Sequence, residues 1–298
     1  FRGDDISIVD GVLSQFSHMD TLKFFQELGM LYKERQGYFY PLSDQATTGC
    51  DVLIMEIERL GVEVFTEEKV VDVRKNDLEF SVKTTNHKFT GDALILATGG
   101  KAAPALGSDG SGYKLAQSVG HTVTELTPSL IPLNIHEGFC SLLKGLSLKN
   151  VNLKILKEGA KKPVFSEMGE MMFTHFGITG PLVLSASAYI NDCEKNKYSA
   201  VIDLKPALDI KTLDNRILRD FQKFSNRDII NSLDELLPKK LIPIIINLAN
   251  INLHKKVNEV SREERANLIS AIKSLTLTVT GKRPIEEAII TRGGIKIS

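Results

Sequence analysis

The chain has 298 residues, of which 42% are hydrophobic and 25% charged, and its 37 basic residues balance its 37 acidic ones. This composition is typical of a soluble globular protein, and the length predicts about two domains with a sizeable core. The balanced charge argues against nucleic acid as a partner, and no apolar run is long enough to span a membrane. The three cysteines are widely spaced and the histidines are scattered, so we expect a cytoplasmic protein without disulfides or a metal site.

The first third of the chain alternates helix and strand signals. An acidic N-cap and apolar residues at helical spacing predict a helix over residues 20–29, and similar spacing predicts another over residues 51–60. Short β-rich runs around these helices predict strands at residues 37–42, 62–65, 70–74, 79–84 and 87–89. Residues 92–97 are continuously apolar after one acid, which is typical of a strand buried on both faces of a parallel sheet.

The middle of the chain changes character. Prolines and turn signals separate β-rich runs that predict a β-barrel or small sandwich, with strands at 133–136, 151–156, 170–173 and 198–204. Helix-sized segments follow at 213–224, 229–236, 239–249 and 262–274. Residues 275–280 return to a strand pattern and close this insert. The fold class that we expect is therefore α/β, or α+β overall.

Two glycine-rich segments could bind a ligand. Thr98–Gly100 follows the apolar run, and small residues after such a strand expose backbone at the sheet edge where doubly wound folds bind ligands. Gly107–Gly112 leads into a short helix, and glycine loops at helix starts offer free N–H groups to anions. Taken alone, the first is also compatible with a plain turn and the second with a surface loop. The second has the order G-x-x-G-x-G, which is not the Rossmann fingerprint.

Taken together, these segments resemble a known family. Residues 97–101 and 107–116 resemble a bacterial flavoprotein family described as NAD(P)/FAD-dependent oxidoreductases, some of whose relatives are linked to bile-acid ring reduction. Further motifs of the resemblance lie at residues 40–46, 127–133, 169–181, 277–281 and 290–295. The resemblance thus covers essentially the whole chain.

The resemblance implies a Rossmann-like FAD-binding domain interrupted by a β-barrel and a small helical bundle. We expect a partial FAD domain at residues 1–128, a barrel at 129–207 and 275–284, a helical subdomain at 208–274 and a return to the FAD domain at 285–298. By the same resemblance, the residues that we expect to lie against FAD are Val70, Val71, Ala97, Thr98, Gly99, Gly100, Gly110 and Gly112.

Two parts of the family pattern are missing from these 298 residues. Family members open with a strand, G-x-G-x-x-G and a helix, and they end with a segment that covers the flavin; neither is present here. The opening Phe-Arg-Gly-Asp-Asp, which lacks a Met, suggests a processed or excised piece of a longer protein. The helix N-terminus of the missing G-x-G-x-x-G motif supplies many of the hydrogen bonds that bind the pyrophosphate of FAD. We therefore expect this chain alone to bind FAD weakly or not at all. We also expect its open sheet edge to need a substitute partner.

One histidine is a candidate catalytic side chain. His175 stands between a β-run and a Gly-Pro helix start, and its imidazole is a candidate proton donor, although a structural histidine carries the greater weight. The leading hypothesis is a parent oxidoreductase that uses FAD and NAD(P)H on a small or medium apolar substrate. The alternatives are a binding or scaffold module without redox chemistry and an RNA-linked role, which the balanced charge disfavours.

Overall fold

A computed structural model describes residues 7–35, 37–193 and 195–297. The opening residues, on which the prediction of a processed start rests, lie outside the described part of the chain. By internal contacts the chain divides into two compact units, Phe1–Lys69 and Val70–Ser298, and each is described by itself.

The first unit is a small group of helices and one hairpin. Its elements are α1 (Ser7–Gln15), α2 (His18–Glu27), β1 (Tyr32–Arg35), β2 (Tyr38–Pro41) and α3 (Thr47–Arg59). A capping box explains the start of α2, because Ser17 and Asp20 each accept the other's backbone N–H. The two predicted helices and the aromatic strand are confirmed. The strand predicted at residues 62–65 is wrong: this segment pairs with no strand among the described residues.

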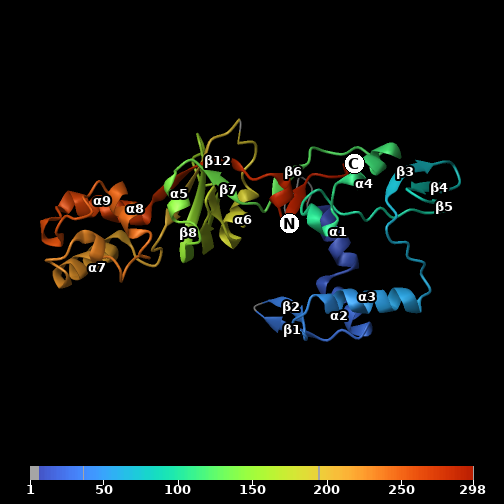
Figure 1. The fold of residues 1–298 in the computed structure, drawn as a ribbon, viewed down its shortest axis with the longest axis horizontal. Coiled ribbons are helices and arrows are strands. Elements are labelled where there is room, and N and C mark those ends of the chain that lie inside the picture. The colour runs from blue at the N-terminus through green and yellow to red at the C-terminus, as the bar shows by residue number, and fades with distance from the viewer. Residues whose placement is uncertain (1–6, 36, 194, 298) are drawn as a thin grey trace. The chain divides into compact units, whose positions relative to one another are not determined.

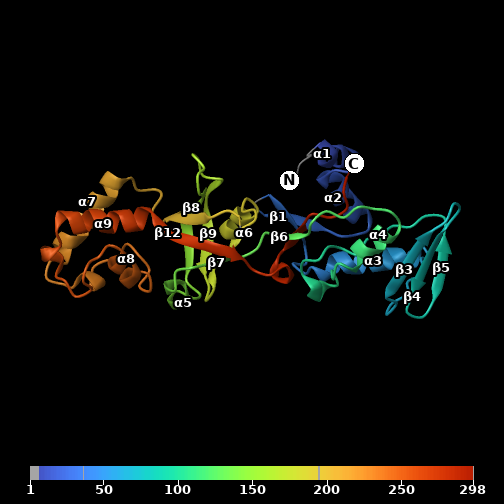
Figure 2. The same ribbon diagram turned by 90° about the horizontal axis from the view of Figure 1, so that it is seen from above.

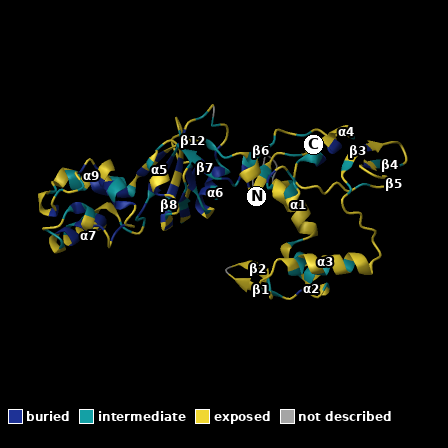
Figure 3. Cartoon of the chain, viewed as in Figure 1, coloured by how far each residue is buried: buried dark blue, intermediate teal, exposed yellow. Residues whose placement is uncertain are grey.

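Very little of this first unit is buried. Met30 is the sole buried hydrophobic residue among its described residues, whereas α3 and the β1–β2 hairpin expose most of their apolar side chains (Figure 3). The hairpin is held by antiparallel pairing from Tyr32↔Pro41 to Arg35↔Tyr38 and by Asp44, which forms ion pairs with Lys33 and Arg35.

The second unit begins with a three-stranded antiparallel sheet. Its strands are β3 (Val70–Lys75), β4 (Phe80–Thr84) and β5 (Lys88–Gly91), which lie side by side in Figure 2. These strands confirm the three short β-rich runs. A turn joins β3 to β4, in which Asn76 Oδ1 accepts from the Glu79 N–H at 3.1 Å.

The buried parallel strand predicted over residues 92–97 is not formed. The segment is unpaired, every sheet of the described residues is antiparallel, and the side chain of Ile95 is 89% exposed. A continuous apolar run indicates that both faces of a strand could be buried. The strand forms only where a neighbouring strand pairs with its backbone N–H and C=O groups. The described residues offer no such neighbour to this segment.

A closed six-stranded barrel forms the centre of the second unit (Figure 1). The strand order is β10-β7-β12-β11-β8-β9, and all pairs are antiparallel. Buried and exposed residues alternate along β12, where Leu275, Leu277 and Val279 point inward, because successive side chains of a strand face opposite sides. The strands are β7 (Leu133–Ile135), β8 (Ser147–Lys157), β9 (Phe165–Phe173), β10 (Gly177–Thr179), β11 (Tyr198–Asp203) and β12 (Leu275–Lys282).

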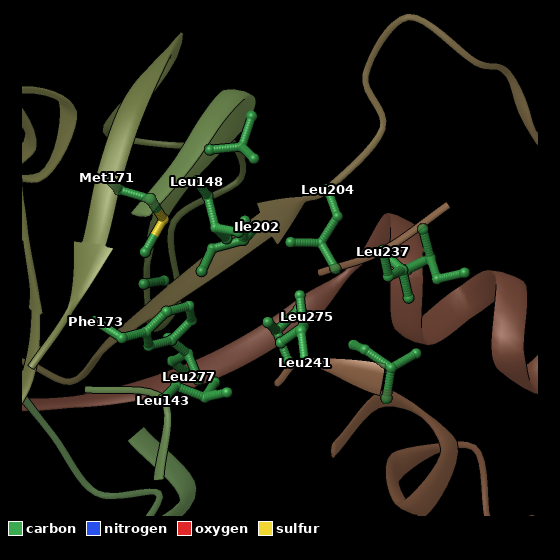
Figure 4. Packing of buried hydrophobic residues seen from close by; sticks show 14 of the residues in the cluster. Leu143, Leu148, Met171, Phe173, Ile202, Leu204, Leu237, Leu241, Leu275 and Leu277 are labelled. Carbon is green, nitrogen blue, oxygen red and sulfur yellow. The ribbon is translucent and has the colours of Figure 1, made fainter. Parts of the chain in front are cut away.

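Helices complete the second unit, and they share one hydrophobic core with the barrel. Figure 4 shows Phe173, Leu275 and Leu241 in this core, and they come from β9, β12 and the start of α8. The helices and short 3-10 turns here are α5 (Phe139–Leu142), α6 (Pro181–Ser187), α7 (Ile210–Lys223), η2 (Ile229–Asn231), α8 (Ile242–Leu248), η3 (Val257–Glu259) and α9 (Arg262–Lys273).

The mixed α/β class with a barrel and several helices is confirmed. The helix predicted over residues 229–236 is shorter than expected, because only the 3-10 turn η2 forms. The Ser232 hydroxyl donates to the Ile229 carbonyl at 2.8 Å, and such local bonds compete with helix formation. Within the described residues, none of the helices has the length and apolar character that crossing a membrane requires.

The remaining elements connect the barrel to the glycine-rich segments. They are η1 (Pro104–Leu106), α4 (Ser111–Ser118), β6 (Thr127–Ser129), η4 (Ile285–Glu287) and β13 (Ile290–Arg292). β6 leads into the barrel and β13 follows it, and the two pair antiparallel with Thr291 opposite Pro128. Lys101 and Ala102 also donate hydrogen bonds to the Thr291 side chain, so β13 lies beside the segment near residue 100.

Candidate functional site

The glycine motifs and the C-terminal strand enclose an open hollow of about 460 Å³. This volume is within the range of small-ligand sites. The hollow is lined by Gly99, Gly100, Ala102, Ala103, Leu106, Ser108, Tyr113, Ile289, Ile290 and Thr291. Its walls therefore come from the turn after residue 97, the loop before α4 and the strand β13.

Thr291 holds these walls together. Its hydroxyl oxygen accepts hydrogen bonds from the backbone N–H groups of Lys101 and Ala102, at 2.8 and 2.9 Å. The Gly110 N–H donates to the Gly100 carbonyl at 3.0 Å and fixes the loop before α4 to the same turn. The glycine turn, the loop before α4 and the distant strand β13 are thus tied by hydrogen bonds from backbone N–H groups to the Thr291 hydroxyl and the Gly100 carbonyl.

The close approach of these segments explains the glycines. A Cβ added at Gly112 would lie 1.9 Å from Thr98 Oγ1, and one at Gly99 would lie 2.4 Å from Ser108 Oγ. A Cβ at Gly100 would lie 2.7 Å from Thr291 Oγ1. These distances are shorter than any ordinary contact, so only glycine lets the turn and α4 pack this closely.

The hollow also offers hydrogen-bond donors. In the part of the chain that the structure describes, the backbone N–H groups of Gly99 and Gly100 donate to no protein acceptor. At the start of α4, the Ser111 N–H is already taken by Asp109 Oδ1 at 2.8 Å, so this helix start offers less to an anion. The free N–H groups of the glycine turn suit a phosphate or a carbonyl oxygen on a ring.

Some of the predicted cofactor residues meet at this hollow. Gly99 and Gly100 line it, and Thr98 and Gly112 meet beside it. Ala97 and Gly110 adjoin the lining residues along the chain but do not line the hollow themselves.

Val70 and Val71 are not brought to the hollow. They lie at the start of β3, and this strand is joined to α4 through the Ser118 hydroxyl, which donates to the Val73 carbonyl at 3.1 Å. Neither valine is among the residues that line the hollow. Their predicted contact with FAD stays a prediction.

His175 lies elsewhere, on the turn between β9 and β10. Its side chain is exposed, and its ring packs edge-on against Phe176 with centroids 5.0 Å apart. The Arg283 guanidinium carbon lies 4.5 Å from the centroid of the Phe176 ring. The same guanidinium donates two hydrogen bonds to the Glu287 carboxylate. The Arg283 guanidinium holds the pKa of Glu287 below its usual value, with a smaller contribution from His175. His175 is therefore part of a polar and aromatic cluster and does not line the hollow.

The sequence did not reveal several lining residues. Thr291 and Tyr113 belong to motifs that the sequence analysis named, and their place in these motifs could have marked them as candidate lining residues. Ile290 stood in the same motif as Thr291, whereas Leu106 and Ile289 carried no signal, because their role depends on which segments meet in space.

None of the residues that line the hollow is a His, Cys, Asp or Glu. Among the described residues, no group of three His, Cys, Asp or Glu side chains could hold a metal ion. Cys140 is buried, and burial raises its thiol pKa to about 11, so it stays protonated at neutral pH.

Comparison with known proteins agrees with the barrel and helices. Residues 127–290, more than half of the chain, match the family model described as "HI0933-like protein barrel and H2TH domain". The chain belongs to the HI0933-like family. The matched residues contain the barrel strands β7–β12 and the helices α7–α9.

Of the individual relatives of this HI0933-like chain, one is named a reductase and two are named synthases. A 3-dehydro-bile acid delta(4,6)-reductase of Clostridium scindens is 30% identical over 99% of this chain and 72% of its own length. The ribosomal RNA dihydrouridine synthase of Escherichia coli is 26% identical over 95% of this chain and 68% of its own length. The ribosomal RNA dihydrouridine synthase of Haemophilus influenzae is 27% identical over 96% of this chain and 69% of its own length. These matches support the flavoprotein oxidoreductase family predicted from the sequence.

Proposed function

We propose that this chain forms part of a reductase that uses FAD, and that the hollow at Gly99 and Gly100 is one wall of its flavin site. The observation that carries the proposal is the pair of free glycine N–H groups on a hollow whose three walls are tied by Thr291. We also propose that residues 1–128 and 285–298 belong to the FAD-binding part, and that the barrel at 129–207 and 275–284 and the helices at 208–274 are inserted in it.

The residues at the hollow fit such a cofactor. FAD needs close backbone approach and donors for phosphate or ring oxygens, and the glycine turn supplies both. When bound, the flavin supplies hydride transfer between NAD(P)H and a carbon–carbon double bond, and a proton completes the reduction. The task of the protein is to hold the reacting rings in place and to exclude water from them.

The apolar part of the lining suggests the substrate class. The side chain of Leu106 is 86% exposed and that of Ile289 is 58% exposed, so the hollow offers uncovered apolar surface. The reductase relative acts, by its name, on a 3-dehydro-bile acid, and a bile acid carries a carboxylic acid on a largely apolar steroid ring system. We propose that this chain's protein reduces a small or medium apolar molecule of that kind.

A second candidate substrate is RNA, because two relatives are named as ribosomal RNA dihydrouridine synthases. The 37 basic and 37 acidic residues leave no net positive charge for a phosphate backbone, which favours the small molecule. Since all three cysteines are free, we propose that the reaction takes place in the cytoplasm.

The test uses the whole natural protein that contains these residues. It should be purified, its visible absorbance recorded for bound flavin, and its flavin reduced without air by NADH or NADPH. A 3-oxo-4,6-diene steroid acid and a uridine-bearing ribosomal RNA fragment are then offered separately. We expect bound flavin and its reoxidation by the steroid and not by the RNA.

Matched glycine variants localise the site. Gly100→Ala places a methyl group against Thr291, whereas a Cβ at Gly138 would meet nothing within 4 Å. We expect Gly100→Ala to lose flavin and Gly138→Ala to keep it. A colourless natural protein would favour the scaffold alternative, and reoxidation by RNA alone would overturn the small-molecule proposal.

A further inference from the structure

Two cations lie together where the barrel meets β13. Lys282 ends β12 and donates from Nζ to the Pro128 carbonyl at 3.2 Å. Pro128 is opposite Thr291 in the β6–β13 pair, so this bond brings the ammonium beside β13. Arg292 ends β13, and its Nη1 donates to Asn191 Oδ1.

Neither cation has a carboxylate partner. Ion pairs are present throughout the described residues, yet none of them involves Lys282 or Arg292. Lys282 has three donors and uses one, and Arg292 has five donors and uses one. Several charged N–H groups therefore remain free at one place.

Burial makes Lys282 the less hydrated of the two cations. Lys282 is half-buried, and burial lowers its pKa from the usual value of 10.5, with a smaller lowering from the charge of Arg292, whose own side chain is exposed. Two close positive charges repel, and partial burial strengthens the repulsion. A bound oxyanion would remove this repulsion and occupy the free donors.

The cations adjoin the apolar wall of the hollow. Ile290 lines the hollow, and Arg292 is two residues further on the same strand, so both side chains leave β13 on the same face. Ile290 is 46% exposed, and Ile289 before it lines the hollow as well. One ligand could thus lay an apolar body along Ile290 and place an anionic end at Arg292.

We propose that Lys282 and Arg292 bind the carboxylate of the apolar substrate and so select acids over uncharged analogues. The guanidinium fork of Arg292 matches the two oxygens of a carboxylate, and the Lys282 ammonium adds a point charge beside it. This inference rests on the proposed function, because it assigns a charged end to the same substrate.

The test compares an acid with its uncharged analogue. Binding of a 3-oxo-4,6-diene steroid carboxylic acid and of its primary carboxamide to the whole flavin-loaded protein is measured by calorimetry without any reductant. We expect the acid to bind about 10- to 100-fold more tightly than the amide, as charge-assisted hydrogen bonds predict. Arg292→Gln and Lys282→Met should each reduce this ratio, and the double variant should abolish it while amide binding is unchanged.

A matched control removes a cation elsewhere. Arg262→Gln, at the start of α9, changes the net charge equally and should keep the ratio, because Arg262 is exposed and has no ion pair among the described residues. Circular dichroism of each variant reports whether it has folded, and Lys282→Arg, which keeps the charge, should retain the preference for the acid.

Several results would overturn the inference. Equal binding of acid and amide by the natural protein would do so, as would a ratio that the variants leave unchanged. If the Lys282 and Arg292 variants change the preference for NADPH over NADH but keep the preference for the acid, the two cations bind the phosphate of the nucleotide instead. Flavin content and reduction of the amide probe report separately on the proposed function, so the two failures are distinguishable.

Discussion

The packing of α4 on the glycine turn can be tested by Gly112→Ala. The new Cβ would lie 1.9 Å from Thr98 Oγ1 and 3.1 Å from Thr98 Cβ, so Thr98 or α4 has to move. Overpacking of this kind costs about 1–3 kcal/mol. Alanine stabilises a helix interior by up to about 1 kcal/mol over glycine, and less in the first turn. We therefore expect a net loss of about 1–2 kcal/mol.

The loss should be local to the hollow. Amide hydrogen exchange in peptides from residues 98–101 and 111–118 should become faster, while exchange in β11 and β12 should not change. The chain has no Trp, so unfolding in urea is best followed by circular dichroism. Gly138→Ala is the matched control, because its Cβ has free space and its φ is −61°.

A second substitution identifies the clashing atom. Thr98→Ala removes Oγ1 and leaves only the Cβ contact at 3.1 Å, so it should recover most of the loss caused by Gly112→Ala. The double variant should then be more stable than the sum of the single variants predicts. Unchanged exchange in Gly112→Ala, or a double variant that is merely additive, would refute this account of the packing.

Three further predictions concern the barrel, a helix cap and a buried cation. Phe173→Ala empties a fully buried site in the barrel and should lower the free energy of unfolding by about 3–5 kcal/mol in denaturant. Ser261→Ala removes the capping box of α9 and should cost about 1 kcal/mol by the same measurement. Because the Lys282 pKa is lowered on folding, the unfolded chain binds that proton more tightly, so stability should rise with pH between the lowered value and 10.5. Lys282→Met should lack this rise in a series of thermal melts, and an identical rise in both proteins would contradict the assignment.

The sequence predicted the periodic elements well. The strand over residues 275–280 and the helix over 262–274 follow from alternation and helical spacing, and both form with nearly these bounds as β12 and α9. Such patterns are reliable because each strand or helix must turn one apolar face to a core. Residues 92–97 show the limit, since an apolar run does not say whether a neighbouring strand exists.

For the site, the sequence by itself determined the family and the glycine segments. The glycines are visible in the sequence because close backbone approach leaves only glycine at such positions. Only the tertiary structure decided that Thr291 closes the hollow, since it acts on Lys101 and Ala102, which lie about 190 residues earlier in the chain. The same holds for Lys282 and Arg292. Their meeting is set by the pairing of β6 with β13, which no local pattern encodes.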